Sequence, residues 1–566
     1  AHAKNKSVRN QSHGSPGNIL DLYAAVDIPE TEGTEILRYK FASSAAHVTG
    51  KPLVSSETAT WLGEHFQSTW GDVQHAVNGY FLGGVNHVFW HGIAYSPAQD
   101  PWPGWLFYAA VHFQPVNPQW ADFTALNAYV TRCQQWLQQG RSDNPVLLYY
   151  PYYDRLAKMD RDLLQHFDGM KGFQHTWFDS TAQWLLQKGV DFDLISDRQL
   201  LDTHATNVAI HTSGNQYQTL VLSGVTYLPL KMMKHLQQLA ASGARILFLQ
   251  DLPAKVPGLF QYKEQELEMK QVWENVHWVI SPEGYRQAAI GKGFFYWGTD
   301  LQRLLKQAGV VRETMTDAGW QFVRRQLSDG HLYFIRNANT TDQRGWVPLS
   351  APEGSAAIYD PVTGNAGKAR MRQRAGRQEI WLELAAGAAC IVRTQSEPFT
   401  ARYFPYYRKA GEPIKLTNNW QLHFESGGPL VPGDTLLPQP VFWTAFPGAL
   451  YRSFSGRAVY RTTFVKPRTM APYIQINPGL IRATGAVWLN GTKIATILQD
   501  GDPVIVPSSS LQTNNTLEIS VSSTMANRIA YMDRAGIAWK KFYNTNFPAR
   551  LPENRDSQGL FTAARW

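Results

Sequence analysis

The rhythm of predicted secondary structure changes once along the chain, near Gly319, and this change constrains the fold most strongly. Before Gly319, short apolar runs typical of strands alternate with longer runs of helical periodicity. After Gly319, only strand-like runs with inward and outward alternation follow one another. Alternating strands and helices predict parallel sheets, whereas consecutive strands predict antiparallel sandwiches. The sequence therefore predicts a multidomain protein, α/β in its first part and all-β in its second.

Residues 1–143 contain repeated βα units. The predicted strands are residues 7–11, 23–28, 52–55 and 87–91, and the predicted helices are residues 33–48, 62–83 and 120–137. Such units fit a (β/α)8 barrel, but four strands make only half of one. Half a barrel would leave two open apolar sheet edges. We therefore expect this region to be the C-terminal half of a catalytic barrel whose first half precedes Ala1.

Residues 144–312 repeat the α/β rhythm in a second domain. Its predicted strands are residues 146–150, 191–196, 219–223, 244–250 and 277–280, with helices such as residues 230–242 between them. This pattern predicts a doubly wound, flavodoxin-like parallel sheet. Neither GxGxxG nor GxxxxGK[ST] occurs in its turns, so no phosphate-binding loop supports a nucleotide role. We interpret this region as a packing domain.

The remaining chain predicts two all-β domains. Residues 313–396 form a small β-sandwich with strands at 321–326, 331–336, 357–359, 379–384 and 390–394. Residues 397–566 comprise a Pro-rich connector and a C-terminal jelly-roll, galactose-binding-like β-sandwich. Its predicted strands are residues 420–424, 458–464, 473–476, 486–489, 492–497 and 517–521. The pair Asn490-Gly491 favours a type I′ hairpin turn. Residues 559–566 run into a strand-like segment, so we expect the C-terminus to be cut as well.

The composition argues against several classes of function. The chain has 53 Lys and Arg against 45 Asp and Glu, without a run of like charges, so we expect no nucleic-acid partner. We also expect no membrane span, because nothing is apolar over roughly 18 residues. The two cysteines, Cys133 and Cys390, fall in different predicted domains and make neither a disulfide framework nor a cysteine-rich metal site. Aromatic residues reach 13%, which suits proteins that cover sugar faces, although large sandwich cores also use aromatics.

Carboxylates follow two neighbouring predicted strands of the first domain. Glu30 and Glu32 come after residues 23–28, and Glu57 comes after residues 52–55. Strand ends of a barrel meet at one rim, so these side chains should converge. Two carboxylates facing a cleft are the minimum for glycoside hydrolysis, because one protonates the leaving oxygen and the other activates water or attacks carbon. Glu30 and Glu32 could instead interact with the positive end of the following helix; Glu57 is the leading catalytic candidate.

Other polar and aromatic residues end strands or follow loops near the same rim. The candidate substrate-binding residues are Asn10, Gln11, His91, Trp61, Trp102 and Trp105. Each has a structural alternative: the polar side chains could hydrogen-bond loop backbone, and the tryptophans could lock the Pro-rich loop of residues 96–103. No GxSxG or HExxH motif occurs, so neither a serine hydrolase nor a transition-metal site is supported.

Residues 10–154 closely resemble the glycoside hydrolase family 106 α-L-rhamnosidases. The blocks that carry the resemblance are DLYAAVDIPETE (21–32), FASSAAHVTGKPLVSSE (41–57), GVNHVFWHGIAYSP (84–97), WPGWLFY (102–108) and YVTRCQQWLQQG (129–140). The later blocks FSGRAVYRTTF (454–464) and VWLNGTKIA (487–495) are similar to the sugar-binding-type sandwich that accompanies many such hydrolases.

The resemblance implies an inverting exo-hydrolase that removes terminal α-L-rhamnose from plant or pectic glycosides, assisted by calcium. Glu57 matches the strand-end glutamate that we expect to be the general base or its close partner, and Glu30 or Glu32 matches the preceding acidic cluster. Inversion predicts carboxyl groups roughly 6.5–9.5 Å apart. Family members are longer at the N-terminus, so we expect one essential carboxylate there and an inactive isolated chain.

Two alternatives remain open, and one further expectation concerns location. A retaining, β-galactosidase-like barrel glycosidase would combine similar domains, with carboxyl groups about 5–5.5 Å apart. A non-catalytic carbohydrate-binding protein would use the barrel segment only to support its sandwiches. In each case we expect a carbohydrate ligand and a secreted or periplasmic protein.

Overall fold

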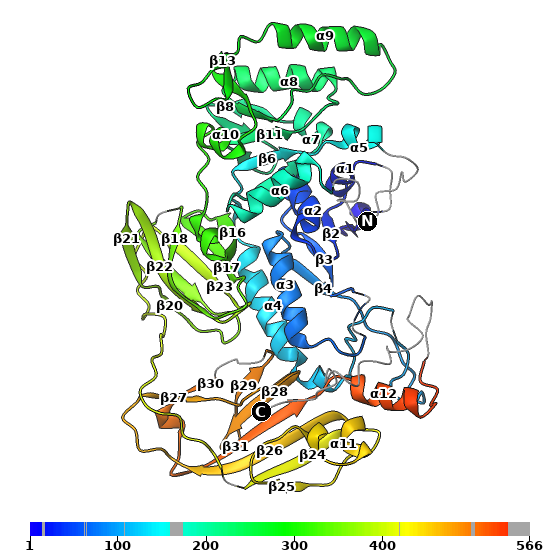
Figure 1. Cartoon of the computed structure of the whole chain (residues 1–566), viewed down its shortest axis with the longest axis vertical. Helices are drawn as coiled ribbons and strands as arrows, with labels where there is room; N and C mark the ends of the chain where they lie inside the picture. The colour runs from blue at the N-terminus through cyan, green and yellow to red at the C-terminus, as the bar shows by residue number, and fades with distance from the viewer. Residues whose placement is uncertain are drawn as a thin grey trace. The chain divides into compact units, whose positions relative to one another are not determined.

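The computed structural model describes residues 1–13, 17–61, 63, 65–106, 108–158, 174–351, 353–417, 419–499 and 504–540. The chain forms two compact units, and Figure 1 labels their helices and strands. The first unit consists of Ala1–Glu57, Asn78–Phe89 and Arg132–Phe404. The second consists of Thr58–Val77, Trp90–Thr131 and Pro405–Trp566. Neither unit is a continuous stretch of chain. The predicted strand-like segment at residues 559–566 lies outside the described residues.

A four-stranded sheet begins the chain. Its strands are β1 (Arg9–Asn10), β2 (Ile28–Thr31), β3 (Ser55–Thr58) and β4 (His87–Trp90), and they lie in this order (Figure 1). β1 pairs in parallel with β2, and β2 pairs in parallel with β3. The helices α1 (Ile19–Ala24), α2 (Ile36–Thr49) and α3 (Trp70–Leu82) alternate with these strands along the chain. The predicted βα rhythm is therefore present.

Two predicted strands and one predicted helix of this region are displaced. The prediction of a strand at residues 23–28 is wrong, because Asn18 accepts a hydrogen bond from the Leu20 N–H and thereby starts α1. The strand begins only at Ile28, so Glu30 lies within β2 rather than after it. Likewise β3 begins at Ser55, which places Glu57 within the strand. The helix predicted from residue 62 begins at Trp70.

Helix α2 is buried on almost every side. All residues from Tyr39 to Ala46 are buried, and the run of Ala and Ser within them lets neighbouring backbone approach closely. Lys40 donates to the Phe192 carbonyl at 2.8 Å, and Ser44 Oγ accepts the Leu194 N–H at 2.8 Å. Both partners belong to β7 (Phe192–Ile195), the edge strand of the next sheet. Helix α2 therefore satisfies backbone groups that this edge would otherwise leave unpaired.

The second sheet has seven strands in the order β13-β14-β15-β12-β11-β6-β7. Its strands are β6 (Val146–Tyr149), β7, β11 (Thr219–Ser223), β12 (Arg245–Leu249), β13 (Val279–Ile280), β14 (Arg286–Ile290) and β15 (Gly293–Gly298). Five of them are parallel, and in chain order they lie 2-1-3-4-5, the order of a flavodoxin-like sheet. The predicted fifth strand at residues 277–280 is not part of this set. It corresponds to β13, which pairs antiparallel with β14, and β15 occupies the fifth parallel position.

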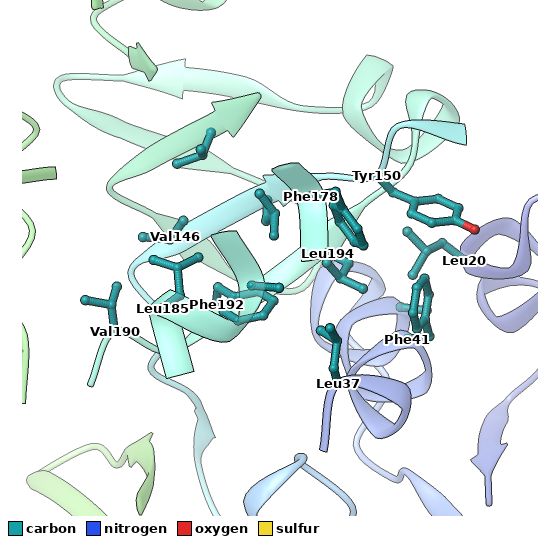
Figure 2. Close-up of a cluster of buried hydrophobic side chains, with 14 of the residues drawn as sticks. Leu20, Leu37, Phe41, Val146, Tyr150, Phe178, Leu185, Val190, Phe192 and Leu194 are labelled. Carbon is teal, nitrogen blue, oxygen red and sulfur yellow. The ribbon is translucent and has the colours of Figure 1, made fainter. Parts of the chain in front are cut away.

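The hydrophobic core of the first unit joins α1 and α2 to this second sheet. Figure 2 shows Leu37 and Phe41 of α2 pointing toward Leu194 of β7. The Phe41 ring meets Tyr150 edge to face at 5.2 Å between centroids. Leu20 of α1 belongs to the same buried cluster. The α2 helix thus contributes to one continuous core rather than to a separate one.

The first unit also contains antiparallel sheets. A six-stranded sheet has the order β20-β19-β23-β17-β16-β5, and two three-stranded sheets have the orders β18-β22-β21 and β10-β9-β8. Their strands are β5 (Arg141–Ser142), β8 (His204–Thr206), β9 (Ala209–His211), β10 (Gln216–Tyr217), β16 (Trp320–Gln326), β17 (Gly330–Asn337), β18 (Gln343–Leu349), β19 (Ser355–Tyr359), β20 (Ala366–Lys368), β21 (Met371–Arg374), β22 (Arg377–Leu384) and β23 (Ala389–Gln395). Antiparallel strands after Gly319 agree with the predicted pattern.

The second unit is built mainly on antiparallel strands. Its six-stranded sheet has the order β25-β24-β26-β31-β28-β29, and β27 pairs with β30. The strands are β24 (Trp420–Gly428), β25 (Thr435–Leu437), β26 (Ser455–Val465), β27 (Tyr473–Ile476), β28 (Thr484–Leu489), β29 (Thr492–Ile497), β30 (Val504–Pro507) and β31 (Asn514–Ser522). Asn490 and Gly491, between β28 and β29, have φ of 52° and 79°. Positive φ at both positions is the geometry that the predicted type I′ turn requires.

The other helices connect these sheets. They are α4 (Phe123–Leu137), α5 (Tyr152–Lys158), α6 (Trp177–Gln187), α7 (Asp197–Leu201), α8 (Leu230–Ala241), α9 (Tyr262–Glu274), α10 (Leu301–Gln307), α11 (Ala449–Ser453) and α12 (Ala526–Arg534), with short 3-10 turns η1 (His2–Lys4), η2 (Pro118–Asp122), η3 (Thr314–Ala318), η4 (Trp443–Ala445) and η5 (Ser508–Ser510). The helix predicted from residue 120 thus begins as the turn η2. Within the described part of the chain, no helix combines the length and the apolar character needed to cross a bilayer.

Candidate active site

The three predicted catalytic carboxylates lie on two neighbouring parallel strands. Glu30 lies within β2, Glu32 directly follows it, and Glu57 lies within β3. The register pairs Glu30 with Ser55 and Thr31 with Ser56. Continued by one residue, this register brings Glu32 opposite Glu57. The predicted convergence of the acidic residues at one sheet edge therefore has a direct structural basis.

A chain of polar contacts links Glu57 to Glu32. The Gln11 Nε2 amide donates to Glu57 Oε2 at 2.5 Å. The Gln11 Oε1 atom lies 2.6 Å from His13 Nε2, which in turn lies 3.6 Å from Glu32 Oε1. A proton on His13 Nε2 satisfies the first of these contacts, and a doubly protonated ring would also attract the Glu32 carboxylate. Gln11 and His13 follow β1, so three segments of chain meet at this point.

Glu30 is held in an ion pair beside this chain. Its Oε2 atom lies 2.9 Å from Arg9 Nη1 and accepts a hydrogen bond from Ser55 Oγ at 2.9 Å. The Arg9 guanidinium lies 3.3 Å from the centroid of the Phe89 ring, which fixes its position. The ion pair with Arg9 and the hydrogen bond from Ser55 both use this one carboxylate oxygen. Glu30 is thus better placed to orient its neighbours than to donate a proton.

The backbone after Glu32 is fixed by a glycine and an arginine. Gly33 has φ of 104°, and a Cβ atom there would lie 2.4 Å from Arg38 Nη1. Any other residue at position 33 would be strained at this φ and would displace the Arg38 side chain. Arg38, in the first turn of α2, lies 3.7 Å from Glu32 Oε1. A second guanidinium therefore lies beside the cluster. It comes from the segment that follows Glu32, whereas His13 comes from the segment that precedes it.

Two stacked tyrosines hydrogen-bond to the backbone of the cluster. Tyr39 and Tyr80 have ring centroids 4.2 Å apart, and both hydroxyls donate to the Gly33 carbonyl at 2.8 Å. The Tyr80 hydroxyl also lies 3.2 Å from the carbonyl oxygen of Glu57. Burial raises the pKa of both phenols above the ordinary value, so they remain hydrogen-bond donors at physiological pH. The backbone of Glu57 and the turn after Glu32 are therefore tied to one buried pair.

The described residues do not fit a calcium site at this edge. Arg9 and Arg38 lie beside Glu30 and Glu32, and the Gln11 amide donates to Glu57. Calcium needs several oxygen ligands that carry no competing cation. Among the residues that the structure describes, no group of three or more His, Cys, Asp or Glu side chains could hold a metal ion. We therefore derive no step of the chemistry through calcium.

Of the predicted binding residues in this unit, only Gln11 joins the cluster. Asn10 is exposed, and its Oδ1 accepts from both the N–H and the hydroxyl of Ser12, which has φ of 57°. Such a contact is an Asx-type turn, in which the side chain stabilises local backbone. Asn10 thus performs the loop-satisfying role that the sequence left as its alternative.

The other predicted binding residues belong to the second unit. His91 Nδ1 lies 2.8 Å from Thr60 Oγ1, and the His91 ring meets Tyr108 edge to face at 6.1 Å. The Trp61 indole N–H donates to Ser68 Oγ at 3.1 Å. Both side chains are partly exposed. They lie in loops that precede α3 and follow β4.

Trp102 and Trp105 make contacts within their own loop region. Trp105 Nε1 donates to Asp100 Oδ2 at 2.7 Å, and Trp102 Nε1 donates to the Val116 carbonyl at 3.2 Å. The Arg528 guanidinium lies 4.0 Å from the centroid of the Trp102 ring. A covered ring face is not available for a sugar, so this arrangement favours the loop-locking role for Trp102.

Several residues of the cluster were not among the predicted site residues. They are Arg9, Arg38, Tyr39 and Tyr80. The spacing of Arg9, Gln11 and His13 at every second position is the signal that could have found Arg9, since such residues share one face of an extended chain. Tyr39 and Tyr80 look like core residues in the sequence and offer no comparable signal.

Comparisons with known proteins identify the family. The family model for α-L-rhamnosidases, glycoside hydrolase family 106, matches residues 21–373, more than half of the chain. The chain therefore belongs to this family. The structure of the rhamnosidase from Novosphingobium sp. PP1Y is similar with a TM-score of 0.79 and 21% identity, over 97% of this chain and 53% of that chain. The fold is thus shared with that protein.

Two further relatives match smaller shares of the chain. The putative β-glucuronidase of Formosa agariphila is 23% identical over 369 residues, which are 62% of this chain and 28% of that protein. The β-galactosidase from Bacillus circulans sp. alkalophilus is 11% identical, with a TM-score of 0.45 over 69% of this chain and 64% of that one. The chain spans about half of the length of the Novosphingobium rhamnosidase and less of the Formosa protein.

Proposed function

We propose that the protein containing this chain is a glycosidase that removes terminal α-L-rhamnose, and that the Glu57 cluster forms part of its active site. The observation that carries the proposal is the meeting of Glu57 and Glu32 at one edge of parallel strands, linked through Gln11 and His13. Family membership supports the reaction class, because glycoside hydrolysis needs carboxylates of this kind.

In this proposal Glu57 is the general base. The neutral Gln11 amide donates to the Glu57 carboxylate and fixes its orientation. A carboxylate held by a neutral donor keeps its orientation and can still take a proton from water. Inversion requires the proton-donating carboxyl group roughly 6.5–9.5 Å from Glu57, with the attacking water between them. Glu32 is the candidate within this cluster, because its contacts with Arg38 and His13, at 3.7 and 3.6 Å, are longer than the 2.9 Å ion pair that holds Glu30. Glu30 with Arg9 positions the strand edge.

The remaining parts of the proposal rest on the family. The substrate class is a rhamnoside of plant or pectic origin, and the protein acts outside the cytoplasm, as a secreted or periplasmic enzyme. Calcium assistance follows from the resemblance alone, and in this proposal the Glu57 cluster takes no part in binding the ion. The half-barrel interpretation of the four-stranded sheet and the jelly-roll interpretation of the second unit are part of the same proposal.

The test compares Glu57→Gln with Glu35→Gln in the full-length protein. Glu35 is exposed, and its side chain makes no capping hydrogen bond at the start of α2, so it is a matched control three residues from Glu32. We expect Glu57→Gln to reduce hydrolysis of an aryl α-L-rhamnoside by about 10²–10⁴-fold without a change in thermal stability. Near-normal turnover of Glu57→Gln would refute its role.

The anomer released first separates the proposal from its alternatives. NMR of the fresh product should show inversion, and retention would favour the β-galactosidase-like mechanism. Binding of rhamnosides by the full-length protein with no cleavage would favour the carbohydrate-binding alternative instead.

A further inference from the structure

A groove lies in the antiparallel part of the first unit and shares no residue with the Glu57 cluster. Its volume is about 700 Å³, within the range of about 300–1,000 Å³ typical of small-molecule sites. Three aromatic residues, Trp346, Phe399 and Tyr403, line it together with Lys368 and Arg370. These residues come from β18, from β20 and the segment after it, and from the segment after β23.

The floor of the groove is built from fixed backbone. Ala356 and Ala369 are buried, and the Ala369 N–H donates to the Ala356 carbonyl at 2.9 Å. The Phe399 N–H donates to Ser355 Oγ at 3.1 Å, which holds this aromatic residue at the rim. Such a floor presents small side chains under larger ones, so the hollow exists before any ligand arrives.

The aromatic walls differ in how firmly they are held. Trp346 is fixed by an edge-to-face contact with Trp381 at 5.4 Å and by the Arg372 guanidinium 4.4 Å from its centroid. Arg372 is itself held by Glu379 at 2.6 Å. Tyr403 is 64% exposed, and Lys368 Nζ lies 4.8 Å from its ring centroid. An exposed ring beside an ammonium group offers an apolar face and a positive charge together.

The charge of the groove has one sign. Lys368 and Arg370 line it, and none of the described residues that line it is an Asp or a Glu. A neutral sugar needs no such field, whereas a carboxylate-bearing sugar gains from two nearby cations in a partly enclosed hollow. Flat aromatic rings suit the apolar faces of pyranose rings, which an inorganic anion does not have.

We propose that this groove is a second carbohydrate-binding site, specific for an acidic oligosaccharide. A sugar ring packs on the exposed face of Tyr403, Trp346 forms a fixed wall of the groove, and uronate carboxylates pair with Lys368 and Arg370. The site binds glycan and takes no part in bond cleavage, so it goes beyond the function proposed for the Glu57 cluster.

The experiment measures binding of tetragalacturonate by calorimetry at low ionic strength, in the full-length protein carrying Glu57→Gln. Loss of turnover in that background cannot be mistaken for loss of groove binding. The paired ligand is the fully methyl-esterified tetragalacturonate, which keeps the sugar faces and removes the charge. We expect the free acid to bind about ten-fold or more tightly than the ester, and added salt to reduce this difference.

Matched variants locate the binding. Tyr403→Ala and Lys368→Met should each weaken tetragalacturonate binding by about ten-fold. Tyr262→Ala and Lys263→Met, exposed neighbours on α9 of the same unit, should leave it unchanged. Equal binding of acid and ester, binding of tripolyphosphate as tight as that of the glycan, or unchanged binding in both groove variants would each overturn the proposal.

Discussion

The side-chain amide of Gln11 donates to the carboxylate of Glu57 over 2.5 Å, and this contact joins the end of β1 to β3 across the intervening strand β2. Gln11 and Glu57 are 46 residues apart in sequence. The orientation of the proposed base therefore depends on a residue from a different βα unit. Such dependence makes Gln11 a positioning residue with a measurable effect.

Changing Gln11 to Glu should strongly reduce rhamnosidase activity of the full-length protein. The substitution keeps the side-chain shape but replaces a donor to Glu57 with a second negative charge. We expect kcat to fall by about ten-fold to a hundred-fold and the pH profile of kcat to change shape. Asn5→Asp adds the same charge at an exposed position of the same segment and is the control. An unchanged pH profile would show that Gln11 does not act on Glu57.

Removal of the Tyr80 hydroxyl should impair activity more than removal of the Tyr39 hydroxyl. Tyr80 contacts the carbonyls of both Gly33 and Glu57, whereas Tyr39 contacts only that of Gly33 among the described contacts. In Tyr80→Phe the Gly33 carbonyl keeps one donor, and the Glu57 carbonyl loses one. We expect kcat to fall several-fold at nearly constant KM for Tyr80→Phe, with a stability loss of about 1 kcal/mol in both variants. Equal kinetics of the two variants would argue against a positioning role for Tyr80.

Asp197 should make the protein less stable as the pH rises from about 4 to about 6. Burial raises the pKa of Asp197 from 3.8 to about 6, although Tyr149 donates to it at 2.8 Å. Between these values the folded state keeps a proton that the unfolded state has lost, so stability falls with increasing pH. The full effect, about 3 kcal/mol, is present above pH 6 and absent below pH 4.

Asp197→Asn tests this dependence because the amide oxygen can still accept from Tyr149. Thermal unfolding of the variant and of the unchanged protein should be compared at pH 4 and pH 7.5. The variant should gain stability relative to the unchanged protein at the higher pH. Asp202→Asn, at an exposed carboxylate after α7, should show no such gain. The same stability difference between Asp197→Asn and the unchanged protein at both pH values would contradict a raised pKa of Asp197.

Asp122 should be important for the stability of the second unit. Its side chain is fully buried, lies 3.3 Å from Arg457 and accepts hydrogen bonds from Thr484 at 2.8 Å and Ser522 at 3.2 Å. Asp122→Ala leaves Thr484 and Ser522 without this acceptor, while Arg457 keeps Glu425 at 3.1 Å, so the substitution should cost about 1–3 kcal/mol. Asp122→Asn keeps an acceptor for Thr484 and should cost less. Calorimetric unfolding measures the stability of both variants. An unchanged unfolding transition of Asp122→Ala would show that the contacts of Asp122 do not stabilise the second unit.

Periodicity and turn chemistry predicted the architecture well where local sequence decides it. The alternation of strands and helices, the flavodoxin-like order and the turn at Asn490 and Gly491 are all present. The failures occur where short apolar runs are ambiguous. Residues 19–24 form a helix because Asn18 caps it, and the run alone cannot distinguish a helical turn from a strand.

The site was predictable only in part, for a physical reason. Glu32, Glu57 and Gln11 could be found because each lies in or just after a strand of the parallel sheet, and such strands share one edge. Their partners Arg9, Arg38 and Tyr80 depend on strand register and on which face of a helix meets the sheet. Those are properties of the folded chain, and a single sequence does not reveal them.

The burial of α2 has a practical consequence for dissecting this protein. Lys40 and Ser44 satisfy backbone groups of β7, while Arg38 at the start of the same helix lies beside Glu32. An excised fragment that stopped before β6 would remove β7 from α2 and expose the apolar surface around Lys40 to solvent. Through α2, the seven-stranded sheet thus stabilises the strands that position Glu32 and Glu57. Expression trials should therefore keep the two sheets on one polypeptide.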